Sequence, residues 1–243
     1  MSADSRSVLK RLITERRTFD RDGVEVEVTG AISLSEADYL HDIILSNELV
    51  TCLETGVAYG ASTVAICAAL AELERRGRAV KHYGVDPCQI DVYKGAAIAA
   101  LEECGSDHLF ELYEQPSHLA LPKLVERNLI FDFVFVDGMH TFDYTLLDLF
   151  FSDKLLRPGG ILCIHDMDLP SKKKALRYLL GHRKYVRLPS TRAGFLDRIR
   201  SAVGCAVKGD LRSSWRRLIT SETMAVVRKT ANFEPPWDFY ARI

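Results

Sequence analysis

A carboxylate stands directly before a glycine-punctuated turn in the segment LETGVAYGAST, residues 53–63. The spacing runs from Glu54 through Gly56 and Ala58 to Gly60, after an apolar run that predicts a strand. A dinucleotide fingerprint, G-x-G-x-x-G, would leave a helix N-terminus free to take a pyrophosphate. A carboxylate at this place would repel a phosphate at close range and attract an ammonium group. The turn therefore favours a cationic, phosphate-free nucleoside ligand.

Three further carboxylates follow apolar runs of the same kind. Asp86, Asp137 and Asp166 each stand at or near the end of a different predicted strand. Because the carboxyl ends of parallel strands meet at one edge of a sheet, we expect these side chains to gather around one ligand, although Asp is also a common helix cap. S-Adenosylmethionine suits such a site, since it joins a cationic amino-acid end and a sulfonium to a ribose diol. Asp86 would then accept hydrogen bonds from the two ribose hydroxyls.

A regular alternation of short β-rich runs and helical segments positions these carboxylates. The strand candidates are 49–54, 79–86, 109–114, 131–137 and 160–166, and the helix candidates between them are 62–76, 90–104, 118–128 and 142–156. Strict alternation predicts an α/β fold with a doubly wound, mostly parallel, Rossmann-like sheet covered by helices on both faces. The segment from Arg157 to Gly160 predicts a helix stop and a tight turn before the fifth strand.

The first part of the chain, residues 1–48, is less regular and predicts a lead-in that packs beside the main domain. Apolar and basic residues alternate at helical spacing over 2–17, and a short strand is expected around Val26. Ser33 and Glu36 have the spacing of a capping box, which predicts a helix start.

The alternation weakens again after Asp166. A helix is expected over 171–181, and two late strand candidates, 184–188 and 224–229, enclose an insertion at about 190–222. The main domain thus spans 49–229, and residues 230–243 predict an ordered tail docked on the body.

Composition places few limits on the partners of this chain. Its 243 residues are 47% hydrophobic and 27% charged, which suits one folded domain with additions. Lys and Arg total 32 against 33 Asp and Glu, so no global charge favours nucleic acid or membrane. The charged N-terminus lacks the apolar core of a signal peptide, and we expect a cytoplasmic protein. The six cysteines form no C-x-x-C pair and are expected to be reduced thiols.

Five motifs in order along the chain carry a family resemblance. They are LETGVAYGAST, YGVDP, PSHLALPKL, FDFVFVDGMHTFDY and LLRPGGILCIHDMD. Together they resemble class I S-adenosylmethionine-dependent methyltransferases, above all the small-molecule O-methyltransferases related to catechol O-methyltransferase and bacterial antibiotic-sugar O-methyltransferases. The resemblance covers about residues 20–190 and implies a seven-stranded sheet whose last strand is antiparallel. It also makes a homodimer an assembly to expect.

The resemblance assigns cofactor contacts residue by residue. The loop from Glu54 to Gly60, with Gly56, Ala58 and Tyr59, matches the segment that approaches the methionine part of the cofactor. The remaining matches are Ser62 for its carboxylate, Asp86 for the ribose, Ser117 and His118 for the adenine edge, and Asp137. Ser62 and Ser117 could equally be helix caps, and His118 a surface histidine.

Asp137 and His140 are the candidates for chemistry at the acceptor. Methyl transfer from a sulfonium is an in-line displacement, so the acceptor must be aligned and must lose its proton. In the resembled metal-dependent enzymes, an aspartate ending the fourth strand binds Mg²⁺, and a basic residue three positions later accepts the proton. The spacing Asp137-Gly138-Met139-His140 matches this pattern. The other interpretation of His140 is a cap for the following helix.

The resemblance also implies a divalent metal at Asp137 and Asp166. The third ligand expected just after Asp166 is Met167, and a thioether is a poor ligand for a hard cation. His165, Asp168 or His140 could complete a mixed site for Mg²⁺, Mn²⁺, Fe²⁺ or Zn²⁺.

No acidic residue occurs between Asp168 and Asp197, whereas eight cationic residues do, beginning with Lys172, Lys173 and Lys174. The plainer interpretation is a solvated helix face. The sharper hypothesis is that this flank contacts an anionic small-molecule acceptor.

Several functions stay open at this point. O-Methylation of a small hydroxylated metabolite comes first, and metal-independent N- or C-methylation would use the same cofactor residues. A hydroxylase-like or non-catalytic relative is a third alternative. RNA methylation is disfavoured, because no aromatic and basic platform or separate RNA-binding module is visible.

Overall fold

A seven-stranded sheet forms the centre of the protein in the computed structural model, which describes residues 1–190 and 222–242. The strand order is β5-β4-β3-β6-β7-β9-β8, and β9 alone runs antiparallel to its two neighbours. The strands are β3 (Thr51–Thr55), β4 (Lys81–Val85), β5 (Phe110–Tyr113), β6 (Phe131–Val136), β7 (Leu156–Ile164), β8 (Tyr185–Arg187) and β9 (Ala225–Lys229). The predicted Rossmann-like fold with an antiparallel last strand is confirmed.

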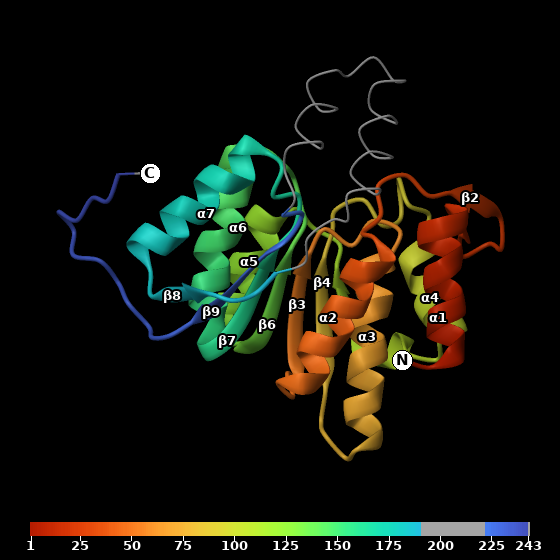
Figure 1. The fold of residues 1–243 in the computed structure, drawn as a ribbon. Coiled ribbons are helices and arrows are strands. Elements are labelled where there is room, and N and C mark those ends of the chain that lie inside the picture. Colours follow the sequence, from red (N-terminus) through yellow and green to blue (C-terminus); the bar gives the residue numbers. More distant parts are fainter. Residues whose placement is uncertain (191–221, 243) are drawn as a thin grey trace.

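Helices cover both faces of this sheet (Figure 1). One layer holds α1 (Ala3–Lys10), α2 (Leu34–Ser46), α3 (Ala61–Arg75) and α4 (Ala96–Glu103). The other holds α5 (Ser117–Glu126), α6 (Phe142–Leu155) and α7 (Pro170–His182). The predicted helix near 90–104 begins later than expected, because turns occupy the residues before Gly95, whose φ of 71° places it in the left-handed region.

Strand side chains alternate between the two faces and fill two separate cores. Cys52, Phe133 and Phe135 point to the layer of α3, whereas Val134 and Val136 point to the layer of α6. Both sets are completely or almost completely buried. Burial on both faces explains why the central strands are nearly continuous apolar runs.

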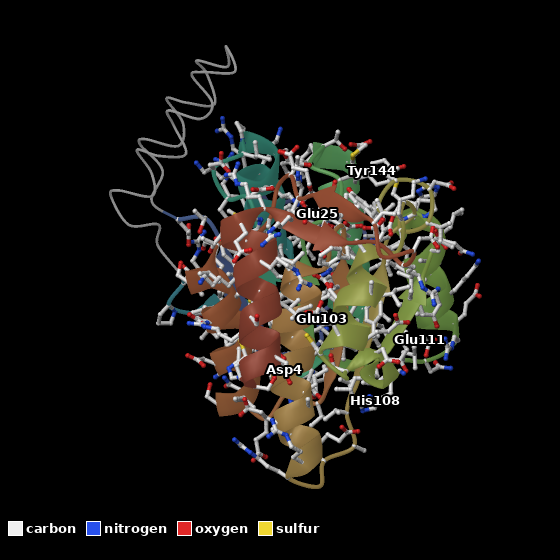
Figure 2. All side chains as sticks on the ribbon, turned by 90° about the vertical axis from the view of Figure 1, so that its right-hand side faces the viewer. Asp4, Glu25, Glu103, His108, Glu111 and Tyr144 are labelled. Carbon is white, nitrogen blue, oxygen red and sulfur yellow. The ribbon has the colours of Figure 1, made fainter. Side chains whose placement is uncertain are left out.

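All the parallel strands end at the same edge of the sheet. Figure 2 shows this polarity, because His108, just before β5, lies low in the view and Tyr144, in the first turn of α6, lies near the top. The backbone N–H of Asp137 donates to the Thr55 carbonyl (2.9 Å), and that of His165 donates to the Val136 carbonyl (3.1 Å). These bonds keep the residues that follow β3, β6 and β7 side by side.

The lead-in combines α1, a π-helical turn (Arg11–Glu15), a hairpin of β1 (Arg17–Phe19) with β2 (Glu25–Glu27), and α2. The capping box is present: the N–H of Glu36 donates to Ser33 Oγ (3.3 Å), and the Ser33 N–H donates to Glu36 Oε2 (2.8 Å). Helix α2 packs along α3, so the lead-in is part of the outer helical layer.

One feature of the second half differs from the prediction. The segment from Arg157 to Gly160 is the early part of β7 and not a turn before it, because Leu156 already pairs with Phe131. The four residues are accommodated as an irregularity in the register, after which Ile161 pairs with Phe133.

The predicted insertion at 190–222 lies almost entirely outside the described residues, as do Arg192 and Cys205. The two described residues that flank it meet, because Ser190 Oγ donates to Glu222 Oε1 (3.0 Å). Tyr39 of α2 also donates its hydroxyl to the Pro189 carbonyl (2.5 Å).

Across the described ranges, no helix is long and apolar enough to cross a membrane. The five described cysteines are free thiols, of which Cys52, Cys67 and Cys163 are buried. Burial raises the pKa of these three thiols. They are packing residues, as the sequence predicted.

Candidate active site

The carboxylate of Glu54 is completely buried beneath the glycine turn. It accepts hydrogen bonds from the hydroxyls of Ser62 and Thr63 (2.7 Å for Thr63) and contacts His82 Nε2 (3.1 Å). These contacts join the end of β3 to the first turn of α3 and to β4. Glu54 therefore stabilises the glycine turn through hydrogen bonds with its neighbours. Because the carboxylate is buried, it is not favoured as a direct contact for the ammonium group of a ligand, which the sequence suggested.

Gly56 brings the turn against the residues after β6. Its φ is 85°, and an added Cβ would lie 2.4 Å from the carbonyl oxygen of Asp137. Only glycine therefore allows this loop to pass so close to the backbone beside the candidate catalytic residues.

Gly56→Ala is accordingly expected to destabilise the protein by more than the 1–2 kcal/mol or so that a left-handed alanine costs by itself. Gly77→Ala is the matched control, because Gly77 has a φ of 81° and nothing within 4 Å of an added Cβ. Urea unfolding of both variants measures the difference. Equal losses would show that the close approach to Asp137 carries no cost.

Asp86 ends β4 as predicted and is 4% exposed. Its Oδ2 accepts the backbone N–H groups of Val57 (2.9 Å) and Ala58 (2.8 Å), and its Oδ1 accepts that of Cys88 (2.8 Å). Ala58 is itself left-handed, with a φ of 47°. The carboxylate thus ties the glycine turn to the neighbouring strand and lies beside the place expected for the ribose.

Tyr59, Ser117 and His118 surround this region. Tyr59 packs edge-on against Tyr93, with ring centroids 4.9 Å apart. His118 Nδ1 lies 3.3 Å from the Tyr144 hydroxyl, and these two side chains line an open pocket of ≈ 250 Å³ with Asp143 and Leu147. The exposed His118 is thus available to a ligand at the predicted adenine edge.

Ser117 lies next to a buried carboxylate, Asp148 on α6. Burial raises the pKa of Asp148 to about 6, while Ser117, the charge of Lys172 and Thr55 partly offset that rise. Asp148 Oδ2 accepts the Thr55 hydroxyl (3.2 Å) at the end of β3. Asp148, on which Lys172 acts through its charge, therefore lies directly beside the end of β3.

Two of the strand-end acids, Asp137 and Asp166, lie close to His140. Asp137, His140 and Asp166 each offer a ligand atom, and these atoms all lie within 4.8 Å of one another. His140 Nε2 is 3.2 Å from Asp166 Oδ2, and the His140 side chain is 52% exposed. Its backbone carbonyl accepts the Ser171 hydroxyl (2.7 Å), which fixes the loop against α7. The cluster pairs an accessible imidazole with two partly buried carboxylates.

Sequence reasoning missed the main role of His165, which was considered only as a spare metal ligand. Its Nδ1 lies 3.2 Å from Asp137 Oδ1 and 3.5 Å from Asp166 Oδ1, and its Nε2 lies 3.4 Å from Glu36 Oε1. Burial would lower the pKa of His165, but the charges and hydrogen bonds of Asp137, Glu36 and Asp166 raise it well above the ordinary value. Burial also raises the pKa of Asp166, which His165 partly counters.

Met167 is no ligand, because its side chain is 1% exposed and belongs to the core beside α7. Its backbone N–H donates to the Thr223 carbonyl (3.0 Å), which connects the segment after β7 to the segment before β9. Asp166 is left-handed, with a φ of 56°, so the chain turns sharply there and buries Met167 while the Asp166 carboxylate stays at the site.

The basic stretch is only partly a solvated face. Lys172 is completely buried, and Arg183 is buried in an ion pair with Asp153 (3.0 Å). Lys174 is exposed and lies over the Phe142 ring, 5.3 Å from its centroid. Two of the eight cations are therefore structural, which weakens the hypothesis of a surface for an anionic acceptor.

Comparison with known families identifies the central part of the chain. Residues 53–167 match a family described as a methyltransferase domain. This range includes the glycine turn, Asp86, Asp137, His140 and Asp166. The resemblance of this range to methyltransferases is confirmed. No curated protein matches the sequence significantly.

Solved structures share the fold at low sequence identity. An O-methyltransferase from Streptomyces achromogenes, TomG, involved in tomaymycin synthesis and solved with S-adenosylmethionine, has 17% identity and a TM-score of 0.63, covering 95% of this chain and 91% of that chain. An O-methyltransferase from Bacillus cereus, solved with S-adenosylhomocysteine, has 12% identity and a TM-score of 0.63, covering 95% and 92%. A methyltransferase from Podospora anserina, PaMTH1, has 14% identity and a TM-score of 0.63, covering 95% and 89%.

Proposed function

We propose that the methyltransferase domain of this chain transfers the methyl group of S-adenosylmethionine to a hydroxyl oxygen of a small molecule. The observation that carries the proposal is the convergence of His140, Asp137 and Asp166 beside a glycine turn closed over strand-end acids. A candidate binding site for the nucleoside of the cofactor thus lies next to a candidate base, His140, and two carboxylates.

The cofactor would lie along the carboxyl edge of β3, β4 and β6. Its ribose would meet Asp86, its adenine would lie near Ser117 and His118, and its amino-acid end would approach Gly56 and Asp137. The N-terminus of α3 adds a positive dipole for the carboxylate of the cofactor. Asp86 Oδ2 already accepts two backbone N–H groups and Oδ1 only one, so Oδ1 can accept one ribose hydroxyl, and a second would have to replace a bond to the turn.

His140 would accept the proton of the acceptor hydroxyl. Its exposure leaves the imidazole accessible, and Asp166 is within 3.2 Å to orient the ring and stabilise the imidazolium that forms. The methyl group then passes from sulfur to oxygen in line, with S-adenosylhomocysteine as the leaving group. The exposed rim at Met139 and His140 is where a small acceptor would enter.

The donor set fits a divalent cation as well. Asp137 and Asp166 would hold it with one imidazole nitrogen, from His140 or His165, a mixed set suited to Mg²⁺, Mn²⁺, Fe²⁺ or Zn²⁺. When bound, such an ion would stabilise negative charge on the acceptor oxygen. Because its Nε2 faces Asp166, His140 would accept the proton of the acceptor hydroxyl at Nδ1.

Calorimetric titration with S-adenosylmethionine and S-adenosylhomocysteine tests the cofactor. We expect wild type to bind both and Asp86→Ala to bind roughly 10- to 100-fold more weakly, since hydrogen bonds to a charged group are worth about 1.5–3 kcal/mol. Asp91→Ala, an exposed acid five residues later, is the control and should bind as wild type does. Absence of binding by wild type would contradict the proposed function, and repeating the titration with Mn²⁺ tests the metal.

A further inference from the structure

His165 is enclosed by carboxylates that come from three parts of the chain. Asp137 follows β6, Asp166 follows β7, and Glu36 belongs to α2 of the lead-in. Each ring nitrogen of His165 faces at least one of them, at 3.2 Å for Asp137 and 3.4 Å for Glu36. The imidazole, 13% exposed, therefore connects the lead-in to the reaction centre.

Glu36 does more than a capping residue requires. Its Oε2 accepts the N–H and the hydroxyl of Ser33 (both 2.8 Å), which completes the helix cap. Its Oε1 has a separate set of partners, since it accepts the Thr223 hydroxyl and faces His165 Nε2. A capping-box glutamate is ordinarily exposed, whereas Glu36 is 5% exposed. The two oxygens thus serve two different purposes.

We propose that Glu36 is a positioning residue for the reaction centre: through His165, it holds the Asp137 carboxylate in the orientation that meets the amino-acid end of the cofactor. The inference rests on the proposed function, and it extends the site to a helix that the methyltransferase family match at 53–167 does not include. Carboxylates that fix a histidine next to functional ligands commonly change affinity or activity by 10- to 100-fold when removed.

The geometry separates this role from helix capping. Ser33→Ala removes the capping hydroxyl but leaves Oε1 and its contacts with His165 and Thr223 in place. Glu36→Gln removes the charge that faces His165. His165→Ala removes the link itself without touching the cap, so it remains informative where Glu36→Gln proves too unstable to purify.

Calorimetry with two probes tests the proposal without an identified acceptor. S-Adenosylhomocysteine carries the amino-acid end, and 5′-methylthioadenosine has the same nucleoside without it. We expect Glu36→Gln and His165→Ala each to bind S-adenosylhomocysteine about tenfold more weakly. The double variant should be no weaker than either single one, because both act through one contact. Affinity for 5′-methylthioadenosine should stay unchanged in all three, and Ser33→Ala should bind both probes as wild type does.

Three outcomes would overturn the inference: unchanged S-adenosylhomocysteine affinity in Glu36→Gln, an equal loss for both probes, or additive losses in the double variant. An equal loss would indicate general loosening of the fold. If wild type bound neither probe, the proposed function itself would fail and the inference with it, whereas the other outcomes leave the cofactor assignment intact.

Discussion

His140→Ala is expected to lower the rate constant of methyl transfer by roughly 10²–10⁴-fold, the usual contribution of a positioned base. The cofactor should still bind with wild-type affinity, because the exposed imidazole pairs with Asp166 and is not among the proposed cofactor contacts. Transfer of a labelled methyl group to an acceptor that wild type uses, measured in single turnovers, gives the rate. The residual rate of the variant should rise with pH, since ionisation of the acceptor then replaces the missing base.

The control is His118→Ala. His118 is another exposed histidine at the same edge of the sheet, and it is the predicted contact for the adenine of the cofactor. The variant should weaken cofactor binding with little effect on the rate at saturating cofactor. A His140→Ala variant with a wild-type rate and pH profile would exclude His140 as the base. Asp137 and Asp166 would then have to align the acceptor without it.

Lys172→Glu is expected to destabilise the fold by about 3–5 kcal/mol, the usual cost of leaving a buried charge uncompensated. Lys172 is 0% exposed, and its ammonium, which has no hydrogen-bond partner in the described part of the chain, lowers the pKa of Asp148 through its charge. The substitution would place two carboxylates in one buried space. Lys174→Glu on the exposed side of α7 is the control and should cost less than about 1 kcal/mol, the value of an exposed cation–π contact.

Urea unfolding at two pH values tests how the stability deficit of Lys172→Glu changes with pH. The folded-state pKa of Asp148 is raised to about 6, so its contribution to stability is fully present below the ordinary value near 3.9 and is lost as the pH rises through about 6. The deficit of Lys172→Glu should therefore be smaller at pH 5 than at pH 8. Equal stability of Lys172→Glu and wild type at pH 8 would mean that residue 172 is hydrated.

Local patterns predicted most of the sheet and the edge that carries the site. Short apolar runs ending in Glu54, Asp86 and Asp137 could be recognised because burial on both faces demands apolar strands and leaves polar residues at their ends. The turn expected at Arg157 to Gly160 was wrong, since residues typical of a turn were absorbed into β7 as a register irregularity. Turn propensity depends on residues adjacent in sequence, whereas the pairing of Leu156 with Phe131 depends on a strand that is distant in sequence.

The sequence could not predict which charged side chains are buried and which groups they contact. Lys172 and Lys174 belong to one run of three lysines on α7, yet Lys172 is buried and acts on Asp148 whereas Lys174 is exposed. Glu36 and His165 are 129 positions apart (165 minus 36), and neither belongs to a motif that implies the other. Their contact arises because α2 lies over the end of β7, a tertiary arrangement that a single sequence does not encode locally.

The contact between Ser190 and Glu222 also has an implication for changes in the length of the chain between them. The chain leaves the sheet after β8 and returns before β9 at one point, where the Ser190 hydroxyl donates to Glu222. Residue 189 and residue 223 are further tied to Tyr39 and Glu36 of α2. A segment inserted between two touching anchors can be lengthened, shortened or exchanged without moving either strand, because closing its ends costs little extra entropy with length. The two anchors therefore fix where the chain leaves and rejoins the sheet beside Glu36, whatever the length of the chain between them.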